Sequence, residues 1–162
     1  MPTVSSSRDT GAVHFEDFVV GERRQLGGKE ITRDAILRFA TEFDPLPIHL
    51  DEDAAKRSIY KGLIASGLHT LCVVASIVVD EVLADSTMTG SAGMTDTKWF
   101  KPVRAGDTLS VVFTVEEAEP WVGRPTIGRV RARLDALNQD EQKVMTTLVD
   151  YLFLRRSSEP SA

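Results

Sequence analysis

The segment from Gly67 to Ala84 constrains the fold more than any other part of the chain. Its centre is apolar on every side and rich in β-branched residues, with Ser76 as its polar break. Periodicity alone does not separate a buried strand from a buried helix here. The length favours a helix, because strands rarely run that long. A helix that is hydrophobic all round is a buried one, so other parts of the chain are expected to cover it.

The second half of the chain has the two-residue period of half-buried strands. Apolar and polar residues alternate through 108–117 and 127–137, and further strands are expected over 143–156 and 95–100. The polar segment 137–142 indicates a turn. No helix separates the last strands, so they are expected to be antiparallel neighbours. The predicted class is α+β, an antiparallel sheet with one long buried helix against a face.

The first half contains one clear helix and a rigid segment directly after it. Thr32 is a suitable N-cap, and the apolar stripe that follows predicts a helix up to Phe43. Pro45 disfavours a helical conformation in the residue before it, so residues 44–48, which hold two prolines, are expected to be irregular and stiff. The acidic start of 51–58 indicates a second, short helix.

Composition excludes several classes of protein. The chain of 162 residues is expected to form one domain over 1–162, and its formal net charge of -5 argues against nucleic acid or an anionic membrane as a partner. Cys72 is the only cysteine, which excludes an internal disulfide and a cysteine-based zinc site. The three histidines lack metal-ligand spacing, so no metal is expected.

The sequence predicts no targeting or membrane-spanning segment. The first residues lack an apolar core, and the longest apolar run, 71–79, is too short to span a bilayer. A cytoplasmic protein is therefore expected. Residues 1–11 and 156–162 are polar and Ser-rich, and they are expected to be frayed.

The stretch "FDPLPIHLD" places Asp44 and His49 on a proline-stiffened segment after the predicted helix. Taken alone, the pair is weak evidence for catalysis. An Asp before a proline is often a turn former, and a lone His is more often structural than catalytic. The surrounding residues 39–70, "FATEFDPLPIHLDEDAAKRSIYKGLIASGLHT", resemble the hydratase motif of the MaoC-like acyl dehydratases. That family includes the (R)-specific enoyl-CoA hydratases.

The family motif consists of an Asp, a variable residue, Asn, Pro, a variable residue and His, followed later by a glycine that opens a long helix. Asp44, Pro47 and His49 fall on the motif positions, and Gly67 falls on the glycine. The stretches "FKPVRAGDTLSV" and "VRARLDALNQDEQKVM" are similar to the family's strand-turn-strand and closing hairpin. The resemblance therefore covers about residues 15–155.

The resemblance implies a hotdog fold, in which an antiparallel sheet wraps a long central helix, here 67–84. It also implies a homodimer or larger homo-oligomer with active sites shared between subunits. The implied activity is that of a lyase of fatty acid metabolism, a hydratase or dehydratase of a 2-enoyl or 3-hydroxyacyl thioester. No cofactor is expected beyond the coenzyme A that forms part of the acyl-CoA substrate.

Hydration of an enoyl thioester needs a group that activates water, a group that delivers a proton, and a donor at the thioester oxygen, where negative charge builds. Asp44 and His49 supply the first two if the prolines hold their segment curled, since five extended residues would span about 16 Å. The N–H of Gly67, at the start of the long helix, is the expected oxyanion donor. Ser66 either caps that helix or contacts the ligand.

Basic residues in the second half are candidates for binding the phosphates of coenzyme A. Lys98, Lys101 and Arg104 flank the turn before the strand at 108–117, and a solvated surface is the alternative role for them. The arginines within 129–133 lie on one face of a predicted strand, which favours a solvated face over a ligand patch. Trp99 is expected to make core or dimer contacts.

Two departures from the family pattern leave other functions open. Leu46 stands at the motif's Asn, and the serine that some family hydratases carry on the central helix falls at about Ala75, next to Ser76. One alternative is a non-catalytic subunit that binds an acyl thioester or a partner, and another is a hotdog thioesterase. The fold does not separate these activities. The Asp-to-His spacing favours the hydratase.

Overall fold

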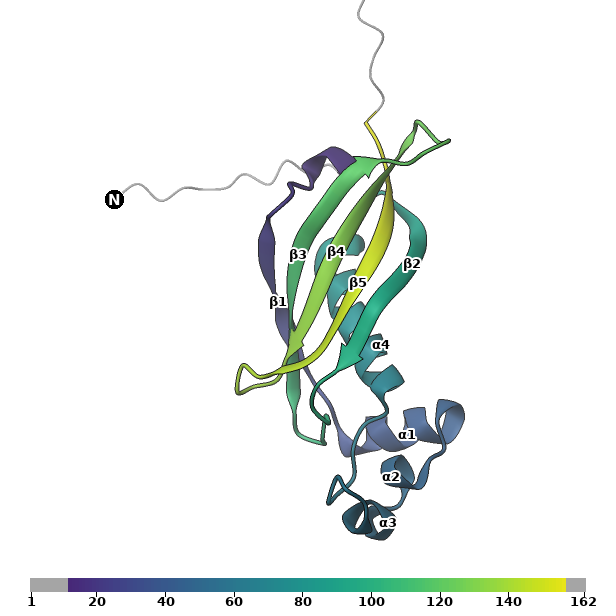
Figure 1. Ribbon diagram of the computed structural model, residues 1–162, viewed down its shortest axis with the longest axis vertical. Helices are drawn as coiled ribbons and strands as arrows, with labels where there is room; N and C mark the ends of the chain where they lie inside the picture. Colours follow the sequence, from purple (N-terminus) through teal and green to yellow (C-terminus); the bar gives the residue numbers. More distant parts are fainter. Residues whose placement is uncertain (1–11, 157–162) are drawn as a thin grey trace, which may run out of the picture.

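A five-stranded antiparallel sheet with one long helix against a face forms the body of the molecule (Figure 1). This computed structural model describes residues 12–156. The frayed ends expected at 1–11 and 156–162 lie outside that range, except for Arg156, which pairs with Asp17 at 2.8 Å. The strands are β1 (Arg23–Glu30), β2 (Met88–Trp99), β3 (Thr108–Pro120), β4 (Ile127–Leu137) and β5 (Lys143–Leu154).

Three short helices lie together beyond one end of the sheet, and the long helix runs from them along the sheet (Figure 1). The helices are α1 (Arg33–Phe43), α2 (Pro47–Leu50), α3 (Glu52–Arg57) and α4 (Gly67–Val78), with a 3-10 turn, η1 (Phe15–Asp17), and a π-helical turn, η2 (Val79–Leu83).

The strand order in the sheet is β1-β3-β4-β5-β2, so β1 and β2 form its two edges. The predicted antiparallel pairing of the last strands is confirmed, because β4 pairs with both β3 and β5 in that sense. The predicted alternation is confirmed as well. The inward residues of β3 are at most 1% exposed, and they are Leu109, Val111, Phe113 and Val115. Together with their neighbours on β4 and β5, they build the core under α4.

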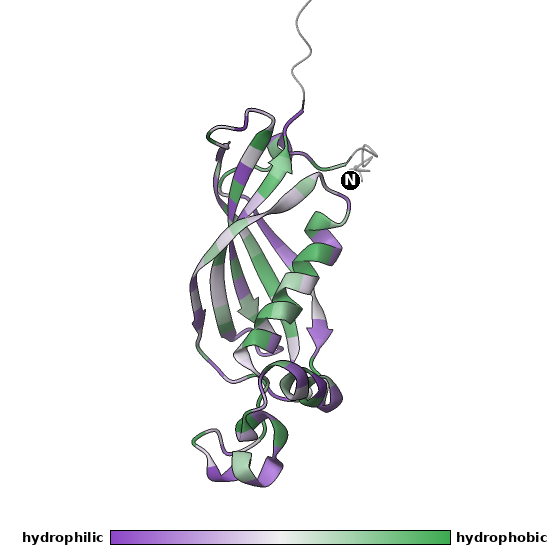
Figure 2. Cartoon of the chain, turned by 90° about the vertical axis from the view of Figure 1, so that its right-hand side faces the viewer, coloured by the Kyte–Doolittle hydropathy of each residue, from purple (hydrophilic) through white to green (hydrophobic). Residues whose placement is uncertain are grey.

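The long helix expected over 67–84 is present, since α4 runs directly into η2. It packs mainly on β3 and β1. The expectation that it is buried on all sides is wrong for the single chain, because Leu68, Cys72 and Val79 are exposed. Figure 2 shows the apolar helix open to view beside the β2 edge. This uncovered face is one feature that the all-apolar sequence could not reveal.

Other expectations about the first half and β2 need correction. Residues 44–48 are not irregular throughout, because Pro47 starts α2; proline suits the first helical position, where its missing N–H has no partner to lose. Strand β1 was not predicted, since its sequence holds two glycines and its one buried residue is Leu26. Strand β2 begins at Met88, well before the predicted 95–100.

The remaining architecture agrees with the sequence. Thr32 caps α1 as predicted, and its side chain accepts a hydrogen bond from the Ala35 N–H at 3.1 Å. An antiparallel sheet curled around one long helix is the hotdog fold, so the expected fold is confirmed. Among residues 12–156, no helix combines the length and apolar character needed to cross a membrane.

Candidate active site

Asp44 and His49 lie side by side at the junction of α1 and α2. Asp44 is the C-cap of α1, and its N–H still donates to the Ala40 carbonyl at 3.0 Å. Pro47 then opens α2, whose single turn brings His49 back toward Asp44. As a result, Asp44 Oδ2 and His49 Nε2 are 3.3 Å apart. The curled segment joins two groups that an extended chain would hold about 16 Å apart.

A backbone carbonyl fixes the orientation of the His49 ring. Its Nδ1 lies 2.8 Å from the Ile64 carbonyl oxygen, and a carbonyl can only accept, so Nδ1 carries the hydrogen. The other ring nitrogen, Nε2, therefore faces Asp44. The ring is buried, and its segment is anchored again by the Ile64 N–H, which donates to the Ile48 carbonyl at 3.2 Å.

Ser66 connects Asp44 to the start of α4. Its hydroxyl donates to Asp44 Oδ2 at 2.6 Å and accepts from the Leu68 N–H at 3.2 Å. Ser66 is thus the N-cap of the helix and a partner of the candidate base at the same time. The serine itself is buried and the Asp44 side chain is 24% exposed, so the hydrogen bond between them is partly shielded from solvent.

The N–H of Gly67, next to this cap, is an unused donor. Gly67 is the first residue of α4, where backbone N–H groups have no partner within the helix. Within residues 12–156 we find no hydrogen-bond acceptor for it. The positive end of the helix dipole lies at the same place. An oxygen that gains negative charge would be stabilised there.

A pocket of about 380 Å³ opens beside these groups. His49 and Gly67 both line it, and much of the remaining wall is apolar. Its other residues are Ile48, Tyr60, Ile64, Ala65, Thr70, Trp99, Phe100, Lys101, Pro102 and Val103. A cleft of this size, largely apolar and with a few convergent polar groups, is the usual form of a small-molecule site.

The MaoC-like domain family matches residues 17–135 of this chain. The chain belongs to that family. The matched range contains Asp44, His49, Ser66 and Gly67 as well as most of the sheet.

Individual relatives of this MaoC-like protein cover most of its length. The "uncharacterized protein YdeM" of Bacillus subtilis is 29% identical over 141 residues, 87% of this chain and 99% of its own. A 3-hydroxybutyryl-CoA dehydratase of Methylorubrum extorquens is 33% identical over 110 residues, 67% of each chain. The crystal structure of a MaoC-like dehydratase from Rhodospirillum rubrum has a TM-score of 0.82 and 36% identity, covering 90% of this chain and 99% of that one.

The three basic residues considered for coenzyme A take different positions in the MaoC-like protein. Lys101 lines the pocket. Trp99 lies opposite the core residue Met145 of β5, and Lys98, the residue before it, lies opposite Thr146. Because successive residues of a strand point to opposite faces, Lys98 points to the other face of β2 from Trp99. The guanidinium of Arg104 donates to the carbonyls of Tyr60 and Leu63, so it braces the loop that carries Tyr60.

Two polar residues of α4 lie off the pocket wall. Ser76 donates to the Val73 carbonyl at 2.8 Å and accepts from Lys29 Nζ at 2.9 Å, a tie between α4 and β1. His69 is buried against Phe39, with the ring centroids 4.9 Å apart and the rings nearly parallel. Its Nδ1 has no hydrogen-bond partner within residues 12–156. Burial, with a smaller contribution from the charge of Arg38, lowers the pKa of His69 below its ordinary value.

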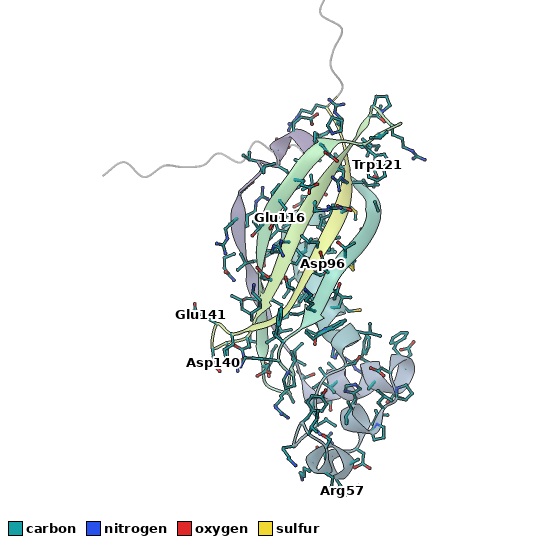
Figure 3. The ribbon with its side chains drawn as sticks, in the orientation of Figure 1. Arg57, Asp96, Glu116, Trp121, Asp140 and Glu141 are labelled. Carbon is teal, nitrogen blue, oxygen red and sulfur yellow. The ribbon has the colours of Figure 1, made fainter. Side chains whose placement is uncertain are left out.

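The arginines of β4 form ion pairs on the outer face of the sheet, away from α4. Arg131 Nε lies 2.8 Å from Asp150, and Arg133 Nε lies 2.7 Å from Glu116, which is labelled on that face in Figure 3. The hydrogen bond from Arg131 holds the pKa of Asp150 below its ordinary value. Paired guanidinium groups of this kind make a solvated charged surface rather than a free anion site.

Trp99 is a pocket residue for which the sequence predicted core or dimer contacts, and the core position is wrong. It lines the pocket next to Gly67 and is 47% exposed. Strand alternation could have put Trp99 and Lys98 on opposite faces of β2. Nothing in the local sequence indicates that this face meets the start of α4, because the contact joins distant parts of the chain.

Proposed function

We propose that this MaoC-like protein adds water to a 2-enoyl thioester, or removes it from a 3-hydroxyacyl thioester, with the acyl group carried on coenzyme A. The observation that carries the proposal is the contact of Asp44 with both Ser66 and His49, the latter of which lines the pocket. The similarity to a 3-hydroxybutyryl-CoA dehydratase points to the same reaction.

In the hydration direction, Asp44 takes a proton from a water molecule while the water oxygen bonds to C3. The electrons of the C2–C3 double bond move toward the thioester and form an enolate, whose oxygen accepts a hydrogen bond from the Gly67 N–H. C2 then takes a proton from His49 Nε2, so this direction starts with His49 as an imidazolium that carries hydrogens on both Nδ1 and Nε2, and the step leaves it neutral. The proton that Asp44 took from the water then passes to Nε2, which restores both groups. Dehydration follows the same steps in reverse.

The surroundings of the pair suit this division of labour. The Ile64 carbonyl holds the His49 Nδ1 hydrogen, so Nε2 is the nitrogen that exchanges a proton at the site. Ser66 holds one oxygen of Asp44, and Oδ1 stays available for the water. Two rigid proline positions limit motion of the segment, and catalysis depends on such fixed geometry.

The carrier is assigned to the mouth of the pocket near Lys101. The ammonium group of Lys101 is the cation that we assign to the phosphates of coenzyme A. The other two candidates from the sequence are not assigned to the phosphates, because Lys98 points to the other face of β2 and Arg104 bonds to backbone carbonyls. The apolar wall formed by residues such as Ile48 receives the acyl chain. A cytoplasmic location fits a coenzyme A ester as substrate.

A second copy of the chain belongs to the same proposal. The edge of β2 that faces away from β5 has no strand partner within residues 12–156, and the exposed apolar face of α4 lies beside it (Figure 2). Leu68, Val79 and the inward-facing Met94 are each about half exposed. We expect light scattering to give at least twice the 17.8 kDa chain mass, and Met94→Lys to lower it. A monomeric wild type would refute this part.

The test of activity is loss of the conjugated enoyl absorbance of crotonyl-CoA, with a free-thiol assay run in parallel. Loss of absorbance without thiol release, abolished in the His49→Ala variant, supports the hydratase. Thiol release would identify a thioesterase. Binding of acyl-CoA with neither signal would leave a non-catalytic acyl-thioester protein, and the hydratase would be abandoned.

A further inference from the structure

We infer that Trp99 is a positioning residue that holds the first turn of α4, so that the Gly67 N–H stays aimed at the thioester oxygen. The inference rests on the proposed function of the pocket. Trp99 is the last residue of β2 and is paired with Met145 of β5, so its position is fixed by the sheet. Its ring reaches from the sheet to the start of the helix.

Two contacts join Trp99 to Gly67. The indole Nε1–H donates to the Gly67 carbonyl at 3.0 Å. The ring also lies against the glycine Cα, because a Cβ placed there would be 3.0 Å from both Cε2 and Nε1 of the indole. A side chain at Gly67 would therefore crowd the tryptophan.

The Gly67 N–H is flanked by two groups that are each held by a hydrogen bond. On one side, Ser66 Oγ is bound to Asp44 at 2.6 Å. On the other side, the Gly67 carbonyl is bound to Trp99. The Gly67 N–H lies between the two anchored groups, so the turn cannot rotate without breaking a hydrogen bond. A donor fixed in advance stabilises a developing charge without the cost of reorganisation.

The exposure of Trp99 separates this role from ordinary core packing. The residue opposite it on β5, Met145, is completely buried, whereas Trp99 is 47% exposed and forms part of the pocket wall. Its neighbour in sequence, Phe100, also lines the pocket. One side of the indole therefore holds the helix, and another part of it meets whatever enters the pocket.

The test compares Trp99→Phe with Trp121→Phe, which changes the other tryptophan in the same way. Trp121 lies at the end of the sheet far from the short helices α1–α3 (Figure 3). Trp99→Phe keeps an aromatic ring and loses the Nε1–H. We expect kcat for crotonyl-CoA hydration to fall about 10- to 100-fold with KM changed less than about threefold, because misplacement of a catalytic group lowers the rate of the chemical step. Trp121→Phe should change neither constant.

A second measurement keeps the inference testable if the protein proves not to be a hydratase. Butyryl-CoA, a saturated thioester that cannot be hydrated, should shift the amide NMR signal of Gly67 in the wild type and shift it much less in Trp99→Phe. An unshifted Gly67 signal in the wild type would overturn the inference whatever the reaction. Equal shifts in both proteins, or an unchanged kcat in Trp99→Phe, would also overturn it. An inactive wild type with the expected NMR difference would overturn only the hydratase.

Discussion

Ser66 and Asp44 share a hydrogen bond of 2.6 Å that links the N-cap of the central helix to the candidate catalytic base. The same oxygen, Asp44 Oδ2, also faces His49 Nε2. It therefore contacts both the residue that caps the helix and the residue that takes part in the proposed chemistry. Substitutions at this point affect helix stability and chemistry together.

Replacing Asp44 with Asn should abolish turnover while the fold is retained. The amide has nearly the same shape and can still accept from Ser66, but it cannot take a proton from water. General-base catalysis is typically worth about 100- to 10,000-fold, so we expect a loss of kcat in that range. Asp53→Asn, which changes an exposed acid on α3, is the control and should keep full activity. Turnover within about threefold of wild type in Asp44→Asn would remove Asp44 as the base.

Two replacements of His49 should separate its structural and chemical roles. An Asn side chain can place an amide N–H near the position of Nδ1 and keep the bond to the Ile64 carbonyl, but it has no group at Nε2. We therefore expect His49→Asn to fold with nearly the wild-type melting temperature and to lose turnover of crotonyl-CoA. His49→Ala should lose turnover and melt earlier. If His49→Asn retained turnover, the proton delivery assigned to Nε2 would be wrong.

Ser66→Ala should lower both stability and activity. Loss of an N-cap costs about 0.5–2 kcal/mol of unfolding free energy, and the same change frees the Asp44 carboxylate to move. Thr32→Ala is the matched control, because it removes the cap of α1, where no site residue is bound. Urea unfolding should show similar losses of stability for the two variants. Only Ser66→Ala should reduce kcat, and equal effects on kcat would show that the serine serves the helix alone.

Leu46→Asn should stabilise the protein. Leu46 is the N-cap of α2, with the extended backbone that a cap requires, but its side chain makes no cap hydrogen bond. Asn is among the best N-cap residues, and we expect a gain of about 0.5–2 kcal/mol in unfolding free energy. Leu46→Ala is the control and should give no gain. A stability no greater than that of Leu46→Ala would mean that α2 does not need the cap.

Protonation of His69 should make stability depend on pH. Burial lowers its pKa in the folded state, so the unfolded chain binds the proton more readily. The stability linked to His69 is therefore complete above the ordinary histidine pKa of about 6.5, and it is lost as the pH falls from there through the lowered pKa. His69→Phe keeps a ring against Phe39 and cannot titrate. Its urea midpoint should fall less than that of wild type between pH 7.5 and pH 5, and parallel curves would contradict the assignment.

Local pattern was sufficient for strands β3 to β5 and for the proximity of Asp44 and His49, and it was insufficient where distant segments meet. The alternation of Leu109, Val111 and Phe113 needs only its own strand, and the approach of His49 to Asp44 needs only the two prolines between them. The bond from Trp99 to Gly67 instead crosses 32 residues, and that from Arg104 to Tyr60 crosses 44. Such contacts depend on the tertiary fold, which no short window contains.

The exposed face of α4 shows a second reason why the sequence did not predict the whole structure. An apolar residue such as Val79 is expected inside when only one chain is considered, yet it lies at the surface of the single chain. Composition indicates that such a residue will be covered, and it does not indicate by which molecule. The missed strand β1 has a related cause, because an edge strand with Leu26 as its one buried residue has little hydrophobic pattern to detect.

The sheet order also sets the sequence of events while the chain is being made. Strand β2 is synthesised before β3 and β4, yet within residues 12–156 its one strand partner is β5. On the ribosome, β2 must therefore remain without a strand partner until three further strands have emerged. Throughout that interval the nascent chain carries an unpaired edge next to an apolar helix, a combination that favours aggregation. This protein should accordingly depend on chaperones during synthesis more than its small size suggests.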